Sequence, residues 1–156
     1  MTGCMACDLI AGRATLPGGS IARTEHWVVE HCVGPLPVGT LLVKPTRHVL
    51  HVRDLTDAEA AELGPLLRDT ARVVDELASP TAEQVYTCLW SHNGSDPVHI
   101  HYVVQPVTRE LLDELGSGPR QQAALFDRGE RPDPAAMEEF ATRARALFGV
   151  RTTDLA

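Results

Sequence analysis

The segment Val98-His99-Ile100-His101-Tyr102-Val103-Val104-Gln105-Pro106 decides the fold of this chain. Its β-branched and aromatic residues predict a strand, along which side chains alternate between two faces. The residues that share one face are His99, His101, Val103 and Gln105. Each histidine on that face needs partners for its ring nitrogens, because an unsatisfied buried polar group costs roughly 1 to 3 kcal/mol. A metal site or a catalytic site satisfies such a pair better than an apolar core.

The segments around this strand predict an α+β fold. Residues 85–91 and 98–105 predict a hairpin whose connection contains Asn-Gly, and strands are expected near 27–32 and 40–44. The capping-box pattern Thr56-Asp57-Ala58-Glu59 begins a long helix, and helices are also expected at 109–115, 121–128 and 134–148. A hairpin, rather than strict strand-helix-strand alternation, favours α+β over a doubly wound sheet. Residues 1–108 form the main body, and 109–156 form a C-terminal helical extension of the same domain.

Composition and charge narrow the classes of function. The chain has 156 residues and a net charge of -7, so it lacks the excess of Lys and Arg with which proteins bind long nucleic acids. No stretch approaches the roughly 20 apolar residues that cross a bilayer. The first residues lack the basic start and apolar run of an export signal, and the four cysteines are therefore expected to be reduced, metal-bound or catalytic. We expect a cytoplasmic protein with no membrane partner, and a small phosphorylated ligand is compatible with this charge.

Three segments, in this order, resemble the histidine triad (HIT) superfamily. The strand at 99–106 resembles the His-φ-His-φ-His-φ-φ signature, with Val103 in place of the third histidine. Residues 4–12 resemble the Cys-x-x-Cys opening of the zinc-bearing branch, and 39–48 resemble the Gly-His-x-Leu-Val-x-Pro-x-x-His segment. The resemblance covers about residues 4–106. It implies an antiparallel sheet of about five strands with one long helix packed on it, and a homodimer.

The resemblance also implies a reaction. In this family the middle histidine attacks the α-phosphorus of a nucleotide, and that role falls on His101. The expected chemistry is that of a nucleotide-phosphate hydrolase or nucleotidyl transferase that cleaves a phosphoanhydride or phosphoramidate bond. Candidate ligand contacts are Asn93, Gly94, Ser95, Gln105 and Glu30.

Two alternatives remain open because Val103 has no proton to give. One is a nucleotide-binding protein with little or no turnover on the HIT scaffold. The other is a zinc-held dimeric scaffold whose helical tail recruits a protein partner. The ribose-binding Asp of the family corresponds to Cys32 here, and the substrate and its base are not fixed by the sequence.

The Cys-x2-Cys pair predicts a metal site. Cys4 and Cys7 supply two soft ligands, but structural zinc takes four ligands in a tetrahedron. In the zinc-bearing HIT branch the other two correspond to His48 and His99, and structural zinc is therefore the expected cofactor. The rivals for a ligand position are His51, His31 and Cys32.

Overall fold

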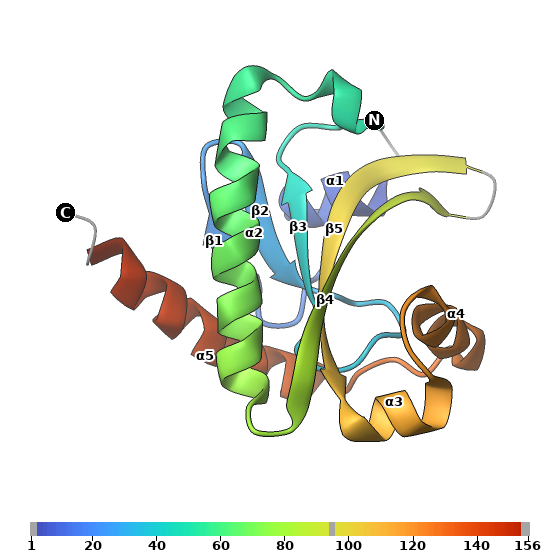
Figure 1. The fold of residues 1–156 in the computed structure, drawn as a ribbon. Helices are drawn as coiled ribbons and strands as arrows, with labels where there is room; N and C mark the ends of the chain where they lie inside the picture. The colour runs from blue at the N-terminus through green and yellow to red at the C-terminus, as the bar shows by residue number, and fades with distance from the viewer. Residues whose placement is uncertain (1–2, 94–95, 154–156) are drawn as a thin grey trace.

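The computed structural model describes residues 3–93 and 96–153 of the chain, arranged as five strands and a set of helices (Figure 1). The strands are β1 (Ser20–Arg23), β2 (Trp27–His31), β3 (Leu41–Pro45), β4 (Ala82–Asn93) and β5 (Asp96–Thr108). The helices are α1 (Met5–Ile10), the 3-10 turn η1 (Val52–Asp54), α2 (Asp57–Ala78), α3 (Arg109–Leu115), α4 (Pro119–Arg128) and α5 (Pro134–Thr153).

All five strands form one antiparallel sheet in the order β1-β2-β3-β5-β4. This arrangement confirms the α+β class and the five-stranded sheet expected from the sequence. The hairpin β4–β5 is longer than expected, because pairing continues from Ala82 with Thr108 as far as Asn93 with Asp96. Helix α1 and strand β1 were not expected from the sequence. Each is too short, at six and four residues, to show a clear periodicity.

The main core lies between one face of the sheet and the helices α2 and α5 (Figure 1). Trp27, Val43 and Val104 from the strands meet Val73 and Val74 of α2 there. Helix α5 contributes residues to this same core, namely Phe140, Ala141 and Ala144. The C-terminal helix is therefore an integral part of the body that the sheet builds.

Helix α2 begins with the capping box that the sequence predicts. Thr56 Oγ1 accepts a hydrogen bond from the Glu59 backbone N–H, and the Glu59 carboxylate accepts one from the Thr56 backbone N–H. The helix continues through Pro65 without interruption. Within the described residues, the structure contains no helix with the length and apolar character needed to cross a membrane.

The opposite face of the sheet carries a smaller apolar cluster. Its buried members are Cys32, Leu36 and Val103, and Trp90 of β4 and Leu125 of α4 pack against them. This is the face that carries the histidines of β5.

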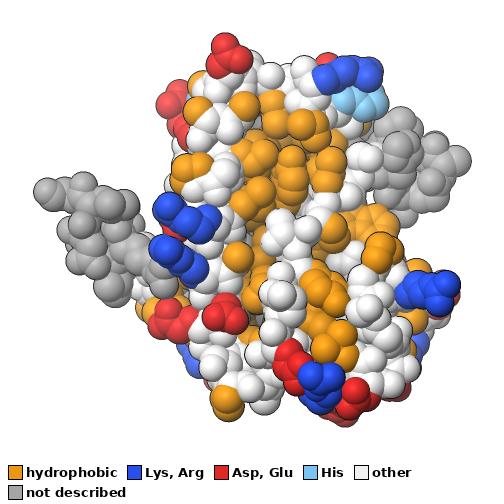
Figure 2. Space-filling model, in the orientation of Figure 1, with side chains coloured by type: hydrophobic (Ala, Val, Ile, Leu, Met, Phe, Trp, Pro, Cys, Tyr) orange, Lys and Arg blue, Asp and Glu red, His pale blue; other side chains and the backbone are white. Residues whose placement is uncertain are grey.

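Strand β4 ends the sheet on one side. Figure 2 shows hydrophobic side chains gathered between α2 and this edge of the sheet. Among the residues of β4, Leu89 leaves 40% of its surface exposed. The edge strand and the helix beside it therefore present an apolar surface.

Candidate functional site

Strand β5 presents its two histidines on the face expected from the alternation. Val103 packs into the smaller apolar cluster, whereas Val104 on the other side belongs to the main core. His99 and His101 precede Val103 by four and two residues, so they share its face. Figure 1 shows α2 covering the opposite face of the sheet.

His99 lies deep in the protein, with 1% of its surface exposed. Its Nε2 lies 2.8 Å from the carbonyl oxygen of Pro45. A carbonyl only accepts, so Nε2 carries the proton and Nδ1 offers a lone pair. Burial lowers the pKa of His99 to about 4, and the hydrogen bond to Pro45 opposes that change. His99 is therefore a neutral ring with its free nitrogen directed at the Cys7 thiol, whose Sγ lies 3.5 Å away.

The four residues expected to hold zinc converge at this point. One ligand atom from each of Cys4, Cys7, His48 and His99 lies within 4.8 Å of the other three. Cys7 Sγ lies 3.3 Å from His48 Nδ1 and 3.5 Å from His99 Nδ1. A tetrahedral zinc with its usual bond lengths separates sulfur and nitrogen ligands by about 3.6 Å. The spacing of these donor atoms therefore fits zinc.

Two further features concern the ligands of this group. Burial raises the pKa of the Cys7 thiol, and its contact with Cys4 adds to that effect, so a metal ion must displace a proton from Cys7 to bind its sulfur. The hydrogen bond from His99 to the Pro45 carbonyl is the kind of outer contact that orients a metal-binding histidine. Together these residues can hold a structural zinc with no further ligand.

The four residues of this candidate zinc site, called the metal group below, come from three distant parts of the chain. Cys4 precedes the first turn of α1 and Cys7 lies within it. The loop after β3 carries His48, and the Ile100 N–H ties this loop to β5 by donating to the Val49 carbonyl at 2.9 Å. The Val49 and Pro45 carbonyls that accept these bonds from β5 lie on either side of His48 in the sequence. The two bonds therefore hold the His48 ring beside the His99 ring, with the ring centroids 5.4 Å apart.

His101, two residues further along β5, has a different hydrogen-bond partner from His99. Its Nδ1 lies 3.1 Å from the carbonyl oxygen of His99, so Nδ1 carries the proton and Nε2 carries the lone pair. Burial lowers the pKa of His101, and the positive charge of Lys44 lowers it further, although the bond to His99 opposes this. A neutral, oriented imidazole is a competent nucleophile near pH 7.

Lys44 and Glu30 form an ion pair between β3 and β2. Both are almost fully buried, with 1% and 2% of their surfaces exposed. Glu30 was expected to contact a sugar, but its carboxylate is enclosed within the protein beside this lysine. Lys44 was not expected at the site, although a lysine within the otherwise apolar strand Leu41–Pro45 is a usable signal.

Gln105 lies fully buried beneath helix α4. Its Nε2 donates to Gln121 Oε1 at 3.1 Å, and its Oε1 accepts from Gln122 Nε2 at 3.0 Å. Cys88 donates to the same Gln122 side chain. Each amide atom of Gln105 has a partner within the protein and the side chain is fully buried, so Gln105 is enclosed rather than exposed to a ligand in this arrangement. Nothing in the local sequence indicated that α4 would cover it.

The remaining expected site residues fall into two groups. Gly94 and Ser95 lie outside the described residues, as does the side chain of Asn93, so their role stays a prediction. Of the rivals for a metal position, His31 instead donates to the Cys32 carbonyl and accepts from the Gly39 N–H, at 2.8 and 2.9 Å. It is a buried structural histidine.

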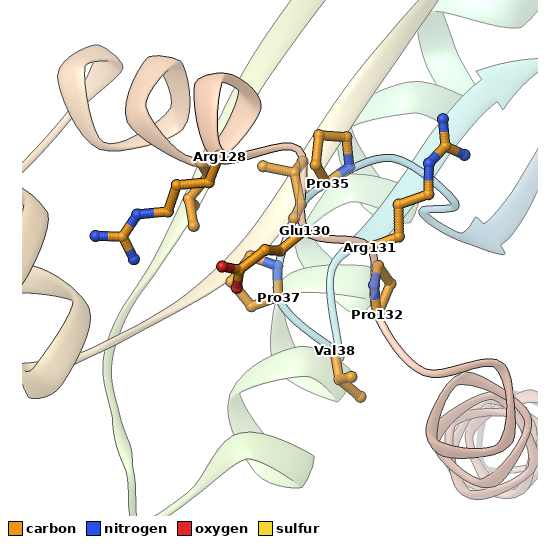
Figure 3. Close-up of a pocket in the computed structure, with 9 residues that line it drawn as sticks. Pro35, Pro37, Val38, Arg128, Glu130, Arg131 and Pro132 are labelled. Atoms are coloured by element: carbon orange, nitrogen blue, oxygen red, sulfur yellow. The ribbon is translucent and has the colours of Figure 1, made fainter.

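A separate hollow of about 180 Å³ lies between the loop after β2 and the end of α4 (Figure 3). Three prolines line it, together with the aliphatic residues Leu36, Val38 and Leu125 and the charged residues Arg128, Glu130 and Arg131. Leu36 and Leu125 separate it from Val103. No histidine is among the residues that line it.

Comparison with solved structures identifies the fold. A zinc-bound histidine triad family protein from Mycobacterium smegmatis superimposes with a TM-score of 0.65 at 19% identity, over 97% of both chains. A Hit-like protein involved in cell-cycle regulation from Bartonella henselae gives 0.71 at 13% identity, over 94% of this chain and 97% of that one. A hypothetical histidine triad nucleotide-binding protein from Sulfolobus tokodaii gives 0.67 at 15% identity, over 94% and 92%.

These matches extend through the C-terminal helices, which the sequence resemblance had left unexplained. No family model matches the sequence, and no curated protein matches it. The likeness is therefore one of structure, and it confirms the resemblance first drawn from the motifs at 4–12, 39–48 and 99–106. The chain has the fold of the histidine triad proteins.

Proposed function

We propose that this protein is a nucleotide-phosphate hydrolase or nucleotidyl transferase that works through His101. The observation that carries the proposal is the hydrogen bond from His101 Nδ1 to the His99 carbonyl, which leaves Nε2 as a lone-pair donor. The lowered pKa of His101 keeps that nitrogen unprotonated at neutral pH. One similar structure is that of a hypothetical histidine triad nucleotide-binding protein, which supports a nucleotide as the ligand.

The proposed reaction has two displacements at phosphorus. The Nε2 lone pair of His101 forms a bond to the α-phosphorus, and the bond from that phosphorus to the leaving group breaks. Water or another acceptor then forms a bond to the phosphorus and releases its proton to solvent, while the phosphorus–nitrogen bond breaks and frees His101 with its Nε2 lone pair. Protons for the leaving group come from solvent, because the apolar Val103 occupies the position two residues beyond His101 on the same face.

The apolar residue Val103 also favours a second candidate function, that of a nucleotide-binding protein with little or no turnover. Val103 is 1% exposed and packs among apolar residues, so no acid or hydrogen-bond donor acts from its position. A protein that binds the nucleotide but turns it over slowly or not at all would have this arrangement. The zinc-held scaffold that recruits a protein partner has no observation in its favour beyond the metal group.

A covalent adduct distinguishes enzyme from binder. The protein is incubated with nucleoside phosphoramidates, dinucleoside polyphosphates and sugar nucleotides, and its intact mass is measured after rapid quenching. An increase by one nucleotidyl group that is lost in His101→Ala, with unchanged circular dichroism, supports the enzyme. Thermal stabilisation by the same compounds without adduct or product supports the binding protein. A panel that gives neither result contradicts both.

We propose that Cys4, Cys7, His48 and His99 hold a structural zinc ion. Metal analysis of protein purified without added zinc should give about one zinc per chain, and Cys7→Ser should lose it. Cys88→Ser is the matched control, because Cys88 lies on β4, in the sheet that carries His99, but is not one of the four proposed ligands. Full folding with negligible metal in the parent protein would contradict the proposal.

We further propose a homodimer that forms through the apolar surface of α2 and β4. Strand β4 lies at the end of the sheet and carries the exposed apolar side chain of Leu89, and such an edge favours pairing with a second copy. Light scattering after gel filtration should give a molar mass of twice that of one chain. The Leu89→Glu variant should have the molar mass of a single chain. Val38→Glu is the control, since Val38 has a similar exposed fraction of 39% in the loop after β2. A monomeric parent protein would contradict this assembly.

A further inference from the structure

Trp90 carries an indole N–H that has no hydrogen-bond partner among the described residues. Its Nε1 is buried and forms no hydrogen bond with any described residue. The other tryptophan of the chain, Trp27, donates from Nε1 to the Glu59 carbonyl at 2.9 Å. A buried donor without an acceptor costs roughly 1 to 3 kcal/mol, so native proteins rarely keep one without a use. The indole of Trp90 therefore requires an explanation that packing alone does not give.

The position of Trp90 relates it to the nucleophile. Trp90 on β4 is the direct cross-strand partner of His101 on β5. Trp90 packs against the cluster that contains Val103, so it lies on the same face as His101. Directly opposed residues on one face have their Cβ atoms about 5 Å apart. The register of the hairpin also shifts between Trp90 and His92, and such irregularities redirect side chains next to active sites.

The C-terminal extension holds the ring of Trp90 in place. The Phe126 ring of α4 lies with its centroid 5.5 Å from that of Trp90, at an interplanar angle of 39°. Leu125 of the same helix packs against the same cluster. Packing against α4 thus supports the indole ring of Trp90 before any ligand arrives.

We propose that Trp90 is a substrate-positioning residue whose indole N–H donates a hydrogen bond to a phosphoryl oxygen of the nucleotide that His101 attacks. This inference rests on the proposed function. Negative charge on the non-bridging oxygens rises as the Nε2–phosphorus bond forms, and a fixed donor beside the phosphorus stabilises it. Indole does not titrate near neutral pH and only donates, so this contact is independent of pH and specific for an acceptor such as a phosphoryl oxygen.

Nuclear magnetic resonance tests the contact directly. The chain has two tryptophans, so ¹⁵N-labelled protein gives two indole N–H signals, and Trp90→Phe assigns them. Titration with AMP should shift the Trp90 signal and slow its hydrogen exchange while the Trp27 signal stays in place. Inorganic phosphate should shift the same signal, and adenosine should not. An equal shift with adenosine would show stacking on the base and would overturn the proposal.

Trp90→Phe supplies the functional measurement. Phenylalanine keeps an aromatic ring against Phe126 but removes the N–H, so the thermal unfolding temperature should change little. We expect AMP affinity to fall about 10-fold, in keeping with one hydrogen bond to a charged group, and kcat/KM to fall further than affinity. If AMP binds and perturbs His101 but neither affinity nor the Trp90 signal changes, the role of Trp90 is wrong and the proposed function stands. If neither AMP nor phosphate binds, the proposed function fails and this inference fails with it.

Discussion

Replacing Glu59 with glutamine tests how the buried charge at the start of α2 stabilises the fold. Glu59 is 3% exposed, and its carboxylate accepts from Arg47 Nε at 2.5 Å and Arg47 Nη2 at 2.7 Å. It also accepts from the Thr56 backbone N–H at 2.7 Å. These contacts, with Arg47 the largest influence, lower the pKa of Glu59 from 4.5 to about 2.

The magnitude and the pH range follow from that pKa. A pKa lowered from 4.5 to about 2 in the folded protein corresponds to about 3 kcal/mol of stability at neutral pH. Because the folded pKa lies below the unfolded one, this contribution is present above about pH 4.5. It is lost as the pH falls from about 4.5 toward about 2. At pH 3 about 1 kcal/mol should remain.

Urea unfolding of the parent protein and Glu59→Gln at pH 7 and pH 3, with chelator throughout, measures this contribution. The variant should be less stable by about 3 kcal/mol at pH 7 and by about 1 kcal/mol at pH 3. Asp75→Asn is the control, since Asp75 is exposed on the same helix, and it should show a small difference at both pH values. A difference for Glu59→Gln that does not change between pH 7 and pH 3 would refute the reasoning.

Three other predictions concern the packing of the C-terminal helices and the metal. Gly18→Ala should cost about 2 to 4 kcal/mol and Gly19→Ala about 1 kcal/mol. Both glycines have positive φ, but a Cβ at Gly18 would lie 2.6 Å from Ala141 Cβ, whereas a Cβ at Gly19 would meet open space. Equal losses of unfolding free energy for the two variants, measured with urea, would contradict the packing of α5. Gln121→Leu should cost about 1 to 3 kcal/mol because it leaves the buried Gln105 Nε2 without its acceptor, and a neutral result would argue against a closed α4. Chelation of bound zinc at pH 7 should lower the melting temperature reversibly, and metal loss without such a change would contradict a structural role.

Local patterns predicted the parts of the site that depend on neighbours in sequence. The alternation along β5 placed His99 and His101 on one face, and the spacing of Thr56 and Glu59 predicted the start of α2. The Cys4–Cys7 pair predicted a metal site, but a pair of ligands does not indicate where the other two lie. The resemblance to the HIT superfamily supplied that information.

The sequence by itself determined the fold class, the histidine-bearing strand and the residue types of the metal group, because strand alternation and capping act over a few residues. Only the tertiary structure decided which polar groups are free. It closes α4 over Gln105, pairs Glu30 with Lys44 and leaves the indole N–H of Trp90 without a described partner. Such outcomes depend on contacts between residues far apart in the chain, such as the 92 positions between Cys7 and His99. Burial decides whether a donor meets water, another side chain or a ligand, and burial is a property of the assembled fold.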